Sequence, residues 1–377
     1  MSGPFKAAHA QAAHWGHAAK ACRDALGELP GGEALGFVYV TPQFADDFAS
    51  IVTFLRETTP VTAWVGGVGL GVMADGHESH DGGALAVMVG ALPGDSFRLF
   101  ESDGDLALLR RTHGAWLAGQ SRVAGLVHGD PRRPEVAEHV AGLAAATDAF
   151  LIGGLTAAQT EADQVAGRVT GAALSGVLLG SEVSLVTGLS QGCSPIGAAH
   201  RVTAAAEGVV RELDGRPALE VLRAEAGEII ARDLRRAAGY IHAALPVAGS
   251  DVGDYLVRNL AGIDPQRGWL AIAAPVATGD SLMFVRRDAN AAQRDFRRML
   301  DDLRRRAAPP AASAPAIRGG VYVSCVARGP RMFGAEGREV ALIHQALGRF
   351  PLVGFYANGE IAGDRLYAYT GVLTLFL

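Results

Sequence analysis

One order of secondary structure, strand–helix–strand–strand, recurs along this chain of 377 residues and constrains its fold more than any other feature. Each copy starts with a short apolar run, continues with apolar residues at helical spacing, and ends in two further strand-like runs. "GFVYV" opens the first copy and the closely similar "GGVYV" opens the last. The copies lie at residues 36–92, 123–180 and 319–377. We therefore expect an α/β (mixed α+β) fold of repeated strand–helix–strand–strand units, with mixed sheets flanked by helices.

The predicted helices are amphipathic. In residues 46–59, Phe48, Ile51, Val52 and Leu55 fall on one face. The other helices are expected at residues 9–26, 134–147, 217–239, 288–306 and 337–348, with Asp288 as the N-cap of the 288–306 helix.

The stretch between the second and third copies has a different pattern. Residues 217–306 combine predicted helices with the strand-like runs "WLAIAAPV" and "SLMFVRR". Polar and turn residues interrupt the apolar pattern at "RELDGRPA", residues 211–218. We place a domain boundary there, which gives two domains, residues 1–213 and 214–377. Two domains also suit the length of the chain.

Composition excludes several classes of protein. The formal net charge is −5, and the arginines of residues 286–306 are interleaved with aspartates, so we expect no nucleic-acid partner. The three cysteines are far apart, which argues against a disulfide scaffold or a zinc ribbon. The sequence shows neither a long uncharged apolar run nor a signal peptide, so we expect a cytoplasmic protein without membrane insertion.

Glycine makes up 49 of the 377 residues, nearly twice its average frequency of about 7%. These glycines lie inside apolar runs, as in "VGGVGLGVM" (65–73), which is typical of strands that a ligand or another backbone approaches closely. The run "GGVGLG" has neither the spacing nor the following helix of a dinucleotide-binding fingerprint. Gly67 and Gly69 are therefore candidates for a backbone-lined ligand wall.

The C-terminal part resembles a known family. "VSCVARGPRMF" (323–333), followed by "FPLVGFYANGEIAG" (350–363), resembles the C-terminal domain of the FIST family. "VGGVGLGVMADGHE" (65–78) resembles the signature of the family's N-terminal domain, and Glu78 matches the acidic residue after its glycines. The resemblance covers almost the whole chain, with residues 1–213 similar to the FIST N domain and residues 214–377 to the FIST C domain.

The resemblance implies a bacterial sensory protein that binds a small molecule, such as an amino acid or a related metabolite. No output domain is expected within the two halves. The signal would then pass to a separate protein, such as a histidine kinase or a cyclase. No cofactor is predicted, although haem stays open because some members of the family are regarded as haem-containing nitric oxide sensors. The oligomeric state is left open.

The candidate ligand site lies where apolar strands end in charged residues. Glu360 follows the turn signal Asn358–Gly359, and Arg328 and Arg331 follow the first strand of the same unit. A guanidinium that binds a carboxylate and a carboxylate that binds an ammonium would form an amino-acid site. The alternative is that Arg328 and Glu360 pair only with each other. We expect the pocket near residues 325–331 and 354–361, with residues 66–71 closing it.

An enzyme is the alternative from another class, a hydrolase or transferase that uses Cys325 or Cys193. A cysteine nucleophile needs a lowered pKa and a nearby base. Cys325 lies among valines, where a cysteine is usually a small buried hydrophobic residue, so we expect it to be structural. The scattered histidines neither support nor exclude haem, because one proximal histidine is sufficient for it.

Overall fold

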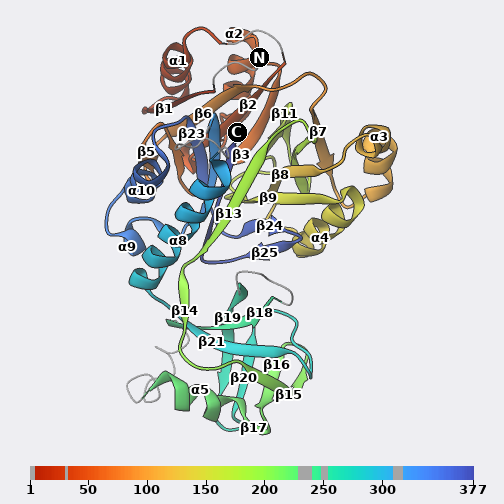
Figure 1. Ribbon diagram of the computed structural model, residues 1–377, viewed down its shortest axis with the longest axis vertical. Coiled ribbons are helices and arrows are strands. Elements are labelled where there is room, and N and C mark those ends of the chain that lie inside the picture. Colours follow the sequence, from red (N-terminus) through yellow and green to blue (C-terminus); the bar gives the residue numbers. More distant parts are fainter. Residues whose placement is uncertain (1–4, 30–32, 228–239, 248–253, 309–316) are drawn as a thin grey trace. The chain divides into compact units, whose positions relative to one another are not determined.

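The computed structural model divides into two compact units, which Figure 1 shows with the element labels used below. The structure describes residues 5–29, 33–227, 240–247, 254–308 and 317–377. Unit 1 comprises Met1–Ser190 and Phe296–Leu377, and unit 2 comprises Gln191–Asp295. Among the described residues, no helix is long and apolar enough to cross a membrane.

The described part of unit 1 contains three sheets of six strands each. In spatial order, the first sheet is β1 (Lys6–Gln11), β6 (Ala84–Ala91), β2 (Ala34–Val40), β3 (Ala63–Val68), β10 (Gln164–Ala166) and β11 (Arg168–Thr170). The second is β7 (Phe97–Ser102), β12 (Leu174–Leu179), β8 (Val123–Gly129), β9 (Ala149–Leu155), β24 (Glu360–Gly363) and β25 (Arg365–Tyr367). The third is β13 (Leu185–Gln191), β26 (Thr370–Phe376), β22 (Gly319–Cys325), β23 (Leu352–Ala357), β4 (Val72–Ala74) and β5 (His77–Ser79).

The three sheets belong to three modules with the same order of elements. β2, β8 and β22 occupy equivalent central places, each between one parallel and one antiparallel neighbour. The prediction of α/β units with mixed sheets is confirmed. The helices are α1 (Trp15–Leu26), η1 (Pro42–Phe44), α2 (Phe48–Thr58), α3 (Leu106–Ala118), α4 (Val136–Thr147), α8 (Ala289–Ala307), α9 (Gly329–Phe333) and α10 (Arg338–Leu347).

Each module begins with one strand and one helix that precede the strand–helix–strand–strand unit: β1–α1, β7–α3 and β13–α8. The sequence predicted helices near α1 and α8, but not α3 or the three strands. The expectation of a helix from residue 9 is wrong, because Lys6–Gln11 pairs with β6 as an antiparallel strand. Sheet pairing overrides the helix propensity of these alanines. The helix starts at Trp15, after His14 Nδ1 accepts a hydrogen bond of 3.0 Å from the Gly16 amide.

The modules exchange hairpins. The hairpin β4–β5 of the first module pairs with β23 of the third, and β24–β25 of the third pairs with β9 of the second. The hairpin β10–β11 of the second pairs with β3 of the first, which closes the cycle. Each sheet is therefore completed by a neighbouring module, and the turn at Asn358–Gly359 is where the chain leaves the third sheet for the second.

Glycine is required where the paired central strands approach most closely. A Cβ atom on Gly66 would lie 1.7 Å from the Val38 carbonyl oxygen, and a Cβ on Gly153 or Gly354 would lie 1.9 Å from the partner strand's carbonyl oxygen. The three glycines hold equivalent positions in β3, β9 and β23. This close pairing explains much of the glycine spacing inside the apolar runs.

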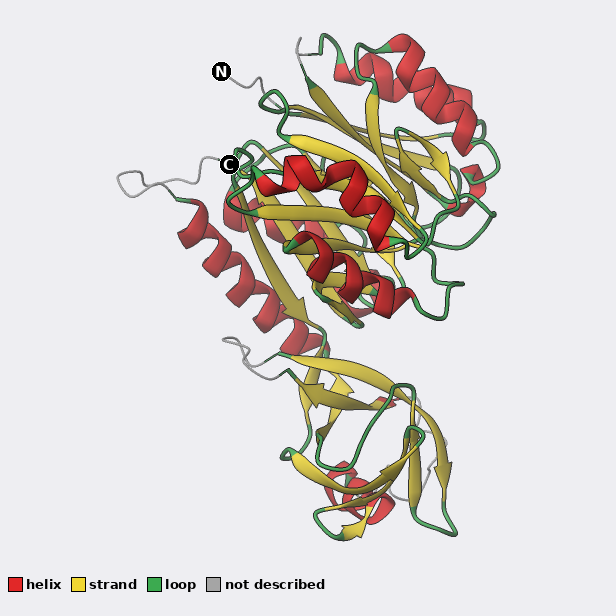
Figure 2. Ribbon diagram, turned by 90° about the vertical axis from the view of Figure 1, so that its right-hand side faces the viewer, coloured by secondary structure: helices red, strands yellow, loops and turns green. Residues whose placement is uncertain are grey.

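Helices cover the outer faces of the sheets of unit 1, as Figure 2 shows. The predicted face of α2, from Phe48 to Leu55, is buried against Val38, Val40 and neighbouring residues of the first sheet. α4 packs similarly on the second sheet through Val140 and Leu143. The inner faces of the sheets are left to pack against one another.

Unit 2 is an antiparallel barrel that interrupts the third module between β13 and α8. Its strands are β14 (Cys193–Pro195), β15 (His200–Ala206), β16 (Val209–Leu213), β17 (Arg216–Pro217), β18 (Ile241–Pro246), β19 (Tyr255–Asp264), β20 (Trp269–Ile272) and β21 (Ser281–Arg287). The pairing of β18 with β21 closes the sheet around a core that α5 (Ala218–Ala226) also contacts. The boundary placed at residues 213/214 falls in the turn between β16 and β17.

The predicted strands "WLAIAAPV" and "SLMFVRR" correspond to β20 and β21. The capping prediction for Asp288 is confirmed, since its Oδ1 accepts a hydrogen bond of 2.9 Å from the Ala291 amide. Of the helix predicted at 217–239, α5 covers Ala218–Ala226, and residues 228–239 lie outside the described part of the chain.

Candidate functional site

The structure brings the three segments of the predicted pocket together around β23. Cys325 pairs with Ala357 in the parallel strands β22 and β23. The Leu70 amide donates to the Tyr356 carbonyl, and the Tyr356 amide donates to the Gly71 carbonyl, each at 2.8 Å. Residues 69–71 therefore run directly beside Tyr356.

Arg328 is fully buried and binds Glu339, a residue that sequence reasoning did not single out. Its Nε donates to Glu339 Oε1 at 3.0 Å and its Nη1 to the Ser190 carbonyl at 3.3 Å. Burial opposes the charge, but Tyr322 and Glu339 raise the pKa of Arg328, so the guanidinium stays protonated. The carbon of the guanidinium lies 5.0 Å and 5.4 Å from the ring centroids of Phe333 and Phe296.

Glu339 is the acceptor at the centre of this network. It accepts hydrogen bonds from Tyr322 Oη at 2.7 Å, from Ser324 Oγ at 3.1 Å and from the Gly329 amide at 3.2 Å. A buried ion pair is retained only when such additional bonds satisfy its remaining lone pairs. The network therefore ties β22, α9 and α10 together, which is a structural role.

Glu360 has partners other than Arg328. Its Oε2 accepts from Thr370 Oγ1 at 2.8 Å and from the Thr370 amide at 3.1 Å, while Oε1 accepts from the Gly359 amide at 3.3 Å. The side chain is fully buried, and burial raises its pKa to about 7 against the weaker opposing effects of these hydrogen bonds and of Arg328. Arg328 and Glu360 therefore have separate internal partners, and a direct contact with a ligand stays a prediction.

Glu78 lies at the start of α10. Its Oε2 accepts from Tyr356 Oη at 2.8 Å, its Oε1 accepts from the Val340 amide at 3.4 Å, and His80 Nε2 lies 3.9 Å away. Burial would raise the pKa of Glu78, but His80, the Gly337 amide, Tyr356 and Val340 together lower it. Glu78 is thus an ionised cap supplied to α10 by the exchanged hairpin.

The other predicted ligand residues are placed as follows. Gly67 and Gly69 are buried, and a Cβ atom on either would lie within 2.9 Å of a backbone oxygen, that of Asp163 or Gly71. Asn358 is exposed in the turn after β23. Arg331 belongs to α9, and its side chain lies outside the described part of the structure. A ligand role for these four residues also stays a prediction.

Both cysteines considered as nucleophiles are buried. Cys325 is 4% exposed and Cys193 5% exposed, so the expected burial of Cys325 is confirmed. Burial, followed by the nearby Glu360, raises the pKa of the Cys325 thiol above its ordinary value. A thiol held in its protonated form is a poor nucleophile.

One aromatic side chain from each module meets at the inner faces of the sheets. Tyr39, His128 and Phe355 lie with ring centroids 4.7–5.8 Å apart, and Tyr39 Oη is 3.0 Å from His128 Nε2. All three are buried. Burial lowers the pKa of His128 to about 3, so its imidazole is neutral.

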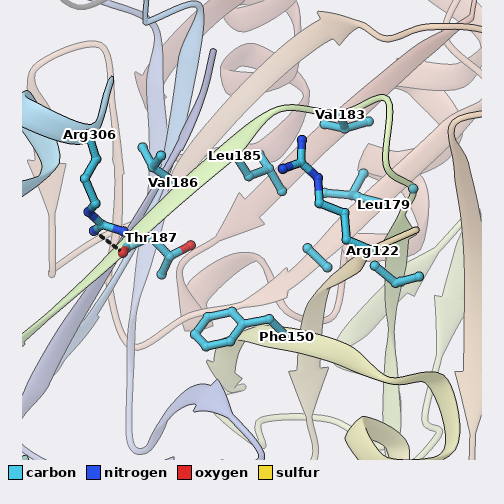
Figure 3. A pocket seen from close by; sticks show the side chains of 11 residues that line it. Arg122, Phe150, Leu179, Val183, Leu185, Val186, Thr187 and Arg306 are labelled. Carbon is cyan, nitrogen blue, oxygen red and sulfur yellow. Dashed lines mark hydrogen bonds between the residues drawn. The ribbon is translucent and has the colours of Figure 1, made fainter. Parts of the chain in front are cut away.

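An open pocket of about 300 Å³ lies elsewhere in unit 1 and is shown in Figure 3. Its volume is at the lower end of the range of small-molecule sites. It is lined by Arg122, Val123, Ala124, Phe150, Leu179, Gly180, Val183, Leu185, Val186, Thr187 and Arg306. These residues come from β8, β9, β12, β13 and α8 and from the loops beside them.

Two guanidinium groups and one aromatic ring define this pocket. Arg122 and Arg306 stand on opposite sides of it, with Phe150 between them at one edge (Figure 3). Phe150 is 52% exposed, an unusual condition for a phenylalanine in a strand whose other residues are buried. A half-exposed aromatic ring beside a cavity is a ready contact surface for a ligand.

Sequence reasoning missed this pocket. It noted Arg306 only among the arginines of residues 286–306 that are interleaved with aspartates, and it did not single out Arg122 or Phe150. The three residues lie far apart in the sequence, and no motif or spacing links them. An aromatic residue such as Phe150 could have pointed to a ligand site. However, the strand "AFLIGGL" is apolar throughout, which predicts a strand that is buried on both faces.

Neither the pocket beside Phe150 nor the surroundings of His128 suit a haem. Among the described residues, no group of three or more histidine, cysteine, aspartate or glutamate side chains is placed to hold a metal ion. The pocket lining contains no histidine, cysteine, methionine or tyrosine, the side chains that ligate haem iron. The ring of His128 is packed against Tyr39 and Phe355. These residues do not fit a haem, and haem binding by another histidine stays a prediction.

Comparison with known proteins gives the family. The sequence model of the FIST N domain matches residues 34–216, and that of the FIST C domain matches residues 218–363. The chain is 30% identical over 404 aligned positions to "Uncharacterized protein Rv0628c" of Mycobacterium tuberculosis (strain ATCC 25618 / H37Rv), with 96% of each chain covered. It is 36% identical over 198 positions to "Uncharacterized protein Mb0898c" of Mycobacterium bovis, with 50% of each covered. The protein therefore belongs to the FIST family, with a FIST N and a FIST C domain in a single chain.

Proposed function

We propose that this protein is a sensory protein that binds an amino acid or a related small metabolite in the pocket beside Phe150. The signal would pass to a separate signalling protein, such as a histidine kinase or a cyclase. The observation that carries the proposal is the pocket itself, a cavity of about 300 Å³ with an aromatic ring left half exposed at its edge.

Family membership supports the sensory class, because FIST domains are generally linked to sensory signalling. The pocket supports the small ligand, since its lining is mostly apolar with a few polar groups, as in most small-molecule sites. The buried cysteines give the enzyme alternative no support.

The pocket is a better ligand site than the cluster around Arg328 and Glu360. Both of these side chains are fully buried and hold internal partners. A ligand there would have to displace them, and breaking a buried ion pair typically costs about 3–5 kcal/mol. The pocket beside Phe150 requires no such rearrangement.

A thermal-shift screen against amino acids and related carboxylates tests the proposal. A ligand present at a hundred times its dissociation constant adds about 2.7 kcal/mol of stability. We expect Phe150→Ala to remove the shift and Leu108→Ala to preserve it. Leu108 is a matched control, because it is also an apolar residue with 52% exposure but lies on α3, outside the pocket. A ligand whose shift is unchanged by Phe150→Ala would contradict this site.

A further inference from the structure

We propose that the pocket selects an organic carboxylate with an apolar, aromatic body, anchored by Arg122, and discriminates against zwitterionic amino acids. This inference rests on the proposed function and narrows the ligand of the same site from amino acids and related metabolites to carboxylates that carry no ammonium group. It follows from three features of the lining: its charges, its hydrogen-bonding groups and its exposed ring.

The two guanidinium groups of the pocket differ in how their charge is balanced. Arg306 Nε lies 2.8 Å from Asp302 Oδ2, and its Nη2 donates to the Thr187 carbonyl. Within the described part of the chain, the one hydrogen bond of the Arg122 side chain is a long one of 3.4 Å to the Ser181 carbonyl. Among the residues that the structure describes, no carboxylate lies within ion-pair distance of Arg122. Its charge is therefore available to a ligand.

A guanidinium is well suited to bind a carboxylate. Its planar array of N–H donors matches the two oxygens of a carboxylate, which gives two parallel charge-assisted bonds. Arg122 is an exposed residue of the pocket lining, so an entering anion can reach it without displacing another side chain. A single bidentate contact is thus expected to orient the ligand.

No lining side chain is suited to an ammonium group. Among the residues that the structure describes, the lining contains no aspartate or glutamate, and its two charged groups, Arg122 and Arg306, are cationic. Thr187 Oγ1 already bonds Thr374 Oγ1 at 2.9 Å, and the Thr187 carbonyl accepts from Arg306. An α-ammonium beside Arg122 would lose water without gaining an anionic partner, which is unfavourable.

The remainder of the lining favours an apolar ligand body. Phe150 presents its ring to the pocket, and valines, leucines and an alanine form most of the other walls. Aromatic rings pair favourably in stacked or edge-to-face arrangements. A ligand ring on Phe150 would cover the exposed ring while its carboxylate lies at Arg122.

Three probes share the same phenyl ring and carbon chain and differ in their charged groups. They are 3-phenylpropanoate, which has a carboxylate, its primary amide 3-phenylpropanamide, which has no charge, and L-phenylalanine, which has a carboxylate and an ammonium group. Calorimetry measures the affinity of each. We expect 3-phenylpropanoate to bind at least tenfold more tightly than either of the other two. Arg122→Gln should weaken binding of the propanoate by about ten- to a hundredfold and leave that of the amide unchanged. Unchanged amide binding also shows that the variant is folded. Arg110 is an exposed arginine of α3, and Arg110→Gln is the control. It should change the affinity of neither the propanoate nor the amide.

The outcomes distinguish this inference from the proposed function. Phenylalanine binding as tightly as the propanoate, and sensitive to Phe150→Ala, would overturn the ligand class and leave the sensory site intact. Propanoate affinity unchanged in Arg122→Gln would overturn the anchor. If neither these probes nor the wider set of amino acids and carboxylates binds, the proposed function itself is wrong.

Discussion

At the scale of single residues, Arg328 and Glu360 of unit 1 are fully buried and have internal partners, so we expect each to affect stability. Arg328 and Glu360 differ in their charge state when buried. Arg328 stays charged because Glu339 lies 3.0 Å away. Glu360 has only hydrogen bonds from Thr370 and Gly359, so burial favours its neutral form.

Glu360 should make stability fall as the pH rises. Its pKa is about 7 in the folded protein, above the ordinary value of 4.5. Between these values the unfolded chain loses the proton while the folded protein keeps it, so the free energy of unfolding decreases from about pH 4.5 to about pH 7. The effect is on the order of 3 kcal/mol. Denaturant unfolding across this range should show a flatter pH dependence in Glu360→Gln than in the wild type, and equal slopes would contradict this assignment.

Arg328→Ala should destabilise unit 1 by about 3–5 kcal/mol, because it leaves Glu339 buried without its cation. Adding Glu339→Gln should recover part of the loss, since the uncompensated charge is then removed as well. Arg349→Ala, at an exposed arginine just after α10, should have little effect. Urea unfolding of the wild type, Arg328→Ala, Glu339→Gln and the double variant measures the coupling between the two residues. Additive losses for Arg328 and Glu339 would show that the pair is not coupled.

At the scale of elements, the exchanged hairpins supply more than an edge strand. The hairpin β4–β5 carries Glu78 to the first turn of α10, where Gly337 has no side-chain cap of its own. A carboxylate at a helix N-terminus both accepts the amide hydrogen bonds and stabilises the helix dipole. The helix of the third module is therefore capped by a residue of the first.

Glu78→Gln should destabilise the protein by about 1–2 kcal/mol at neutral pH. The pKa of Glu78 is lowered in the folded protein, so its contribution is present above the ordinary value of 4.5 and is lost as the pH falls through the folded value. The difference between wild type and variant should thus shrink in acid, opposite to Glu360. Glu57→Gln, in the exposed last turn of α2, is the control. A difference independent of pH would argue against a charged cap.

At the scale of the whole molecule, the modules of unit 1 are interdependent, whereas unit 2 closes on itself. The second sheet needs β24 and β25 from the C-terminal part of the chain, and the hairpin β4–β5 needs β23 as its partner. The barrel of unit 2 pairs its own strands and surrounds its own core. Folding should therefore follow the compact units and not the linear order of the sequence.

Two fragments test this division. Residues 191–295 should give a folded barrel, with a dispersed amide NMR spectrum and a cooperative unfolding transition. Residues 1–213 should give neither, because they lack the strands that complete the second sheet. The full chain serves as the reference for both spectra. A well-folded 1–213 fragment would show that the hairpin exchange is dispensable.

The sequence predicted local structure well, because helical and strand periodicities are local properties. It predicted the face of α2, the Asp288 cap and the mixed sheets of the repeated units. It could not predict where a hairpin pairs, since "NGEIAG" has the same local pattern whether β24 joins the third sheet or the second. The partner of Arg328 and the pocket beside Phe150 depend on the same long-range pairing, so the sequence pattern did not reveal either.

The central claim, that a small carboxylate binds beside Phe150, is tested most directly by a crystal structure of the full chain with 3-phenylpropanoate. We expect ligand density in the pocket, with the carboxylate within hydrogen-bond distance of the Arg122 guanidinium and the ring against Phe150. The ion pair of Arg328 with Glu339 should be unchanged from the unliganded protein. Density beside Arg328 or Glu360, with the pocket empty at a saturating concentration of a ligand that binds in solution, would contradict the account.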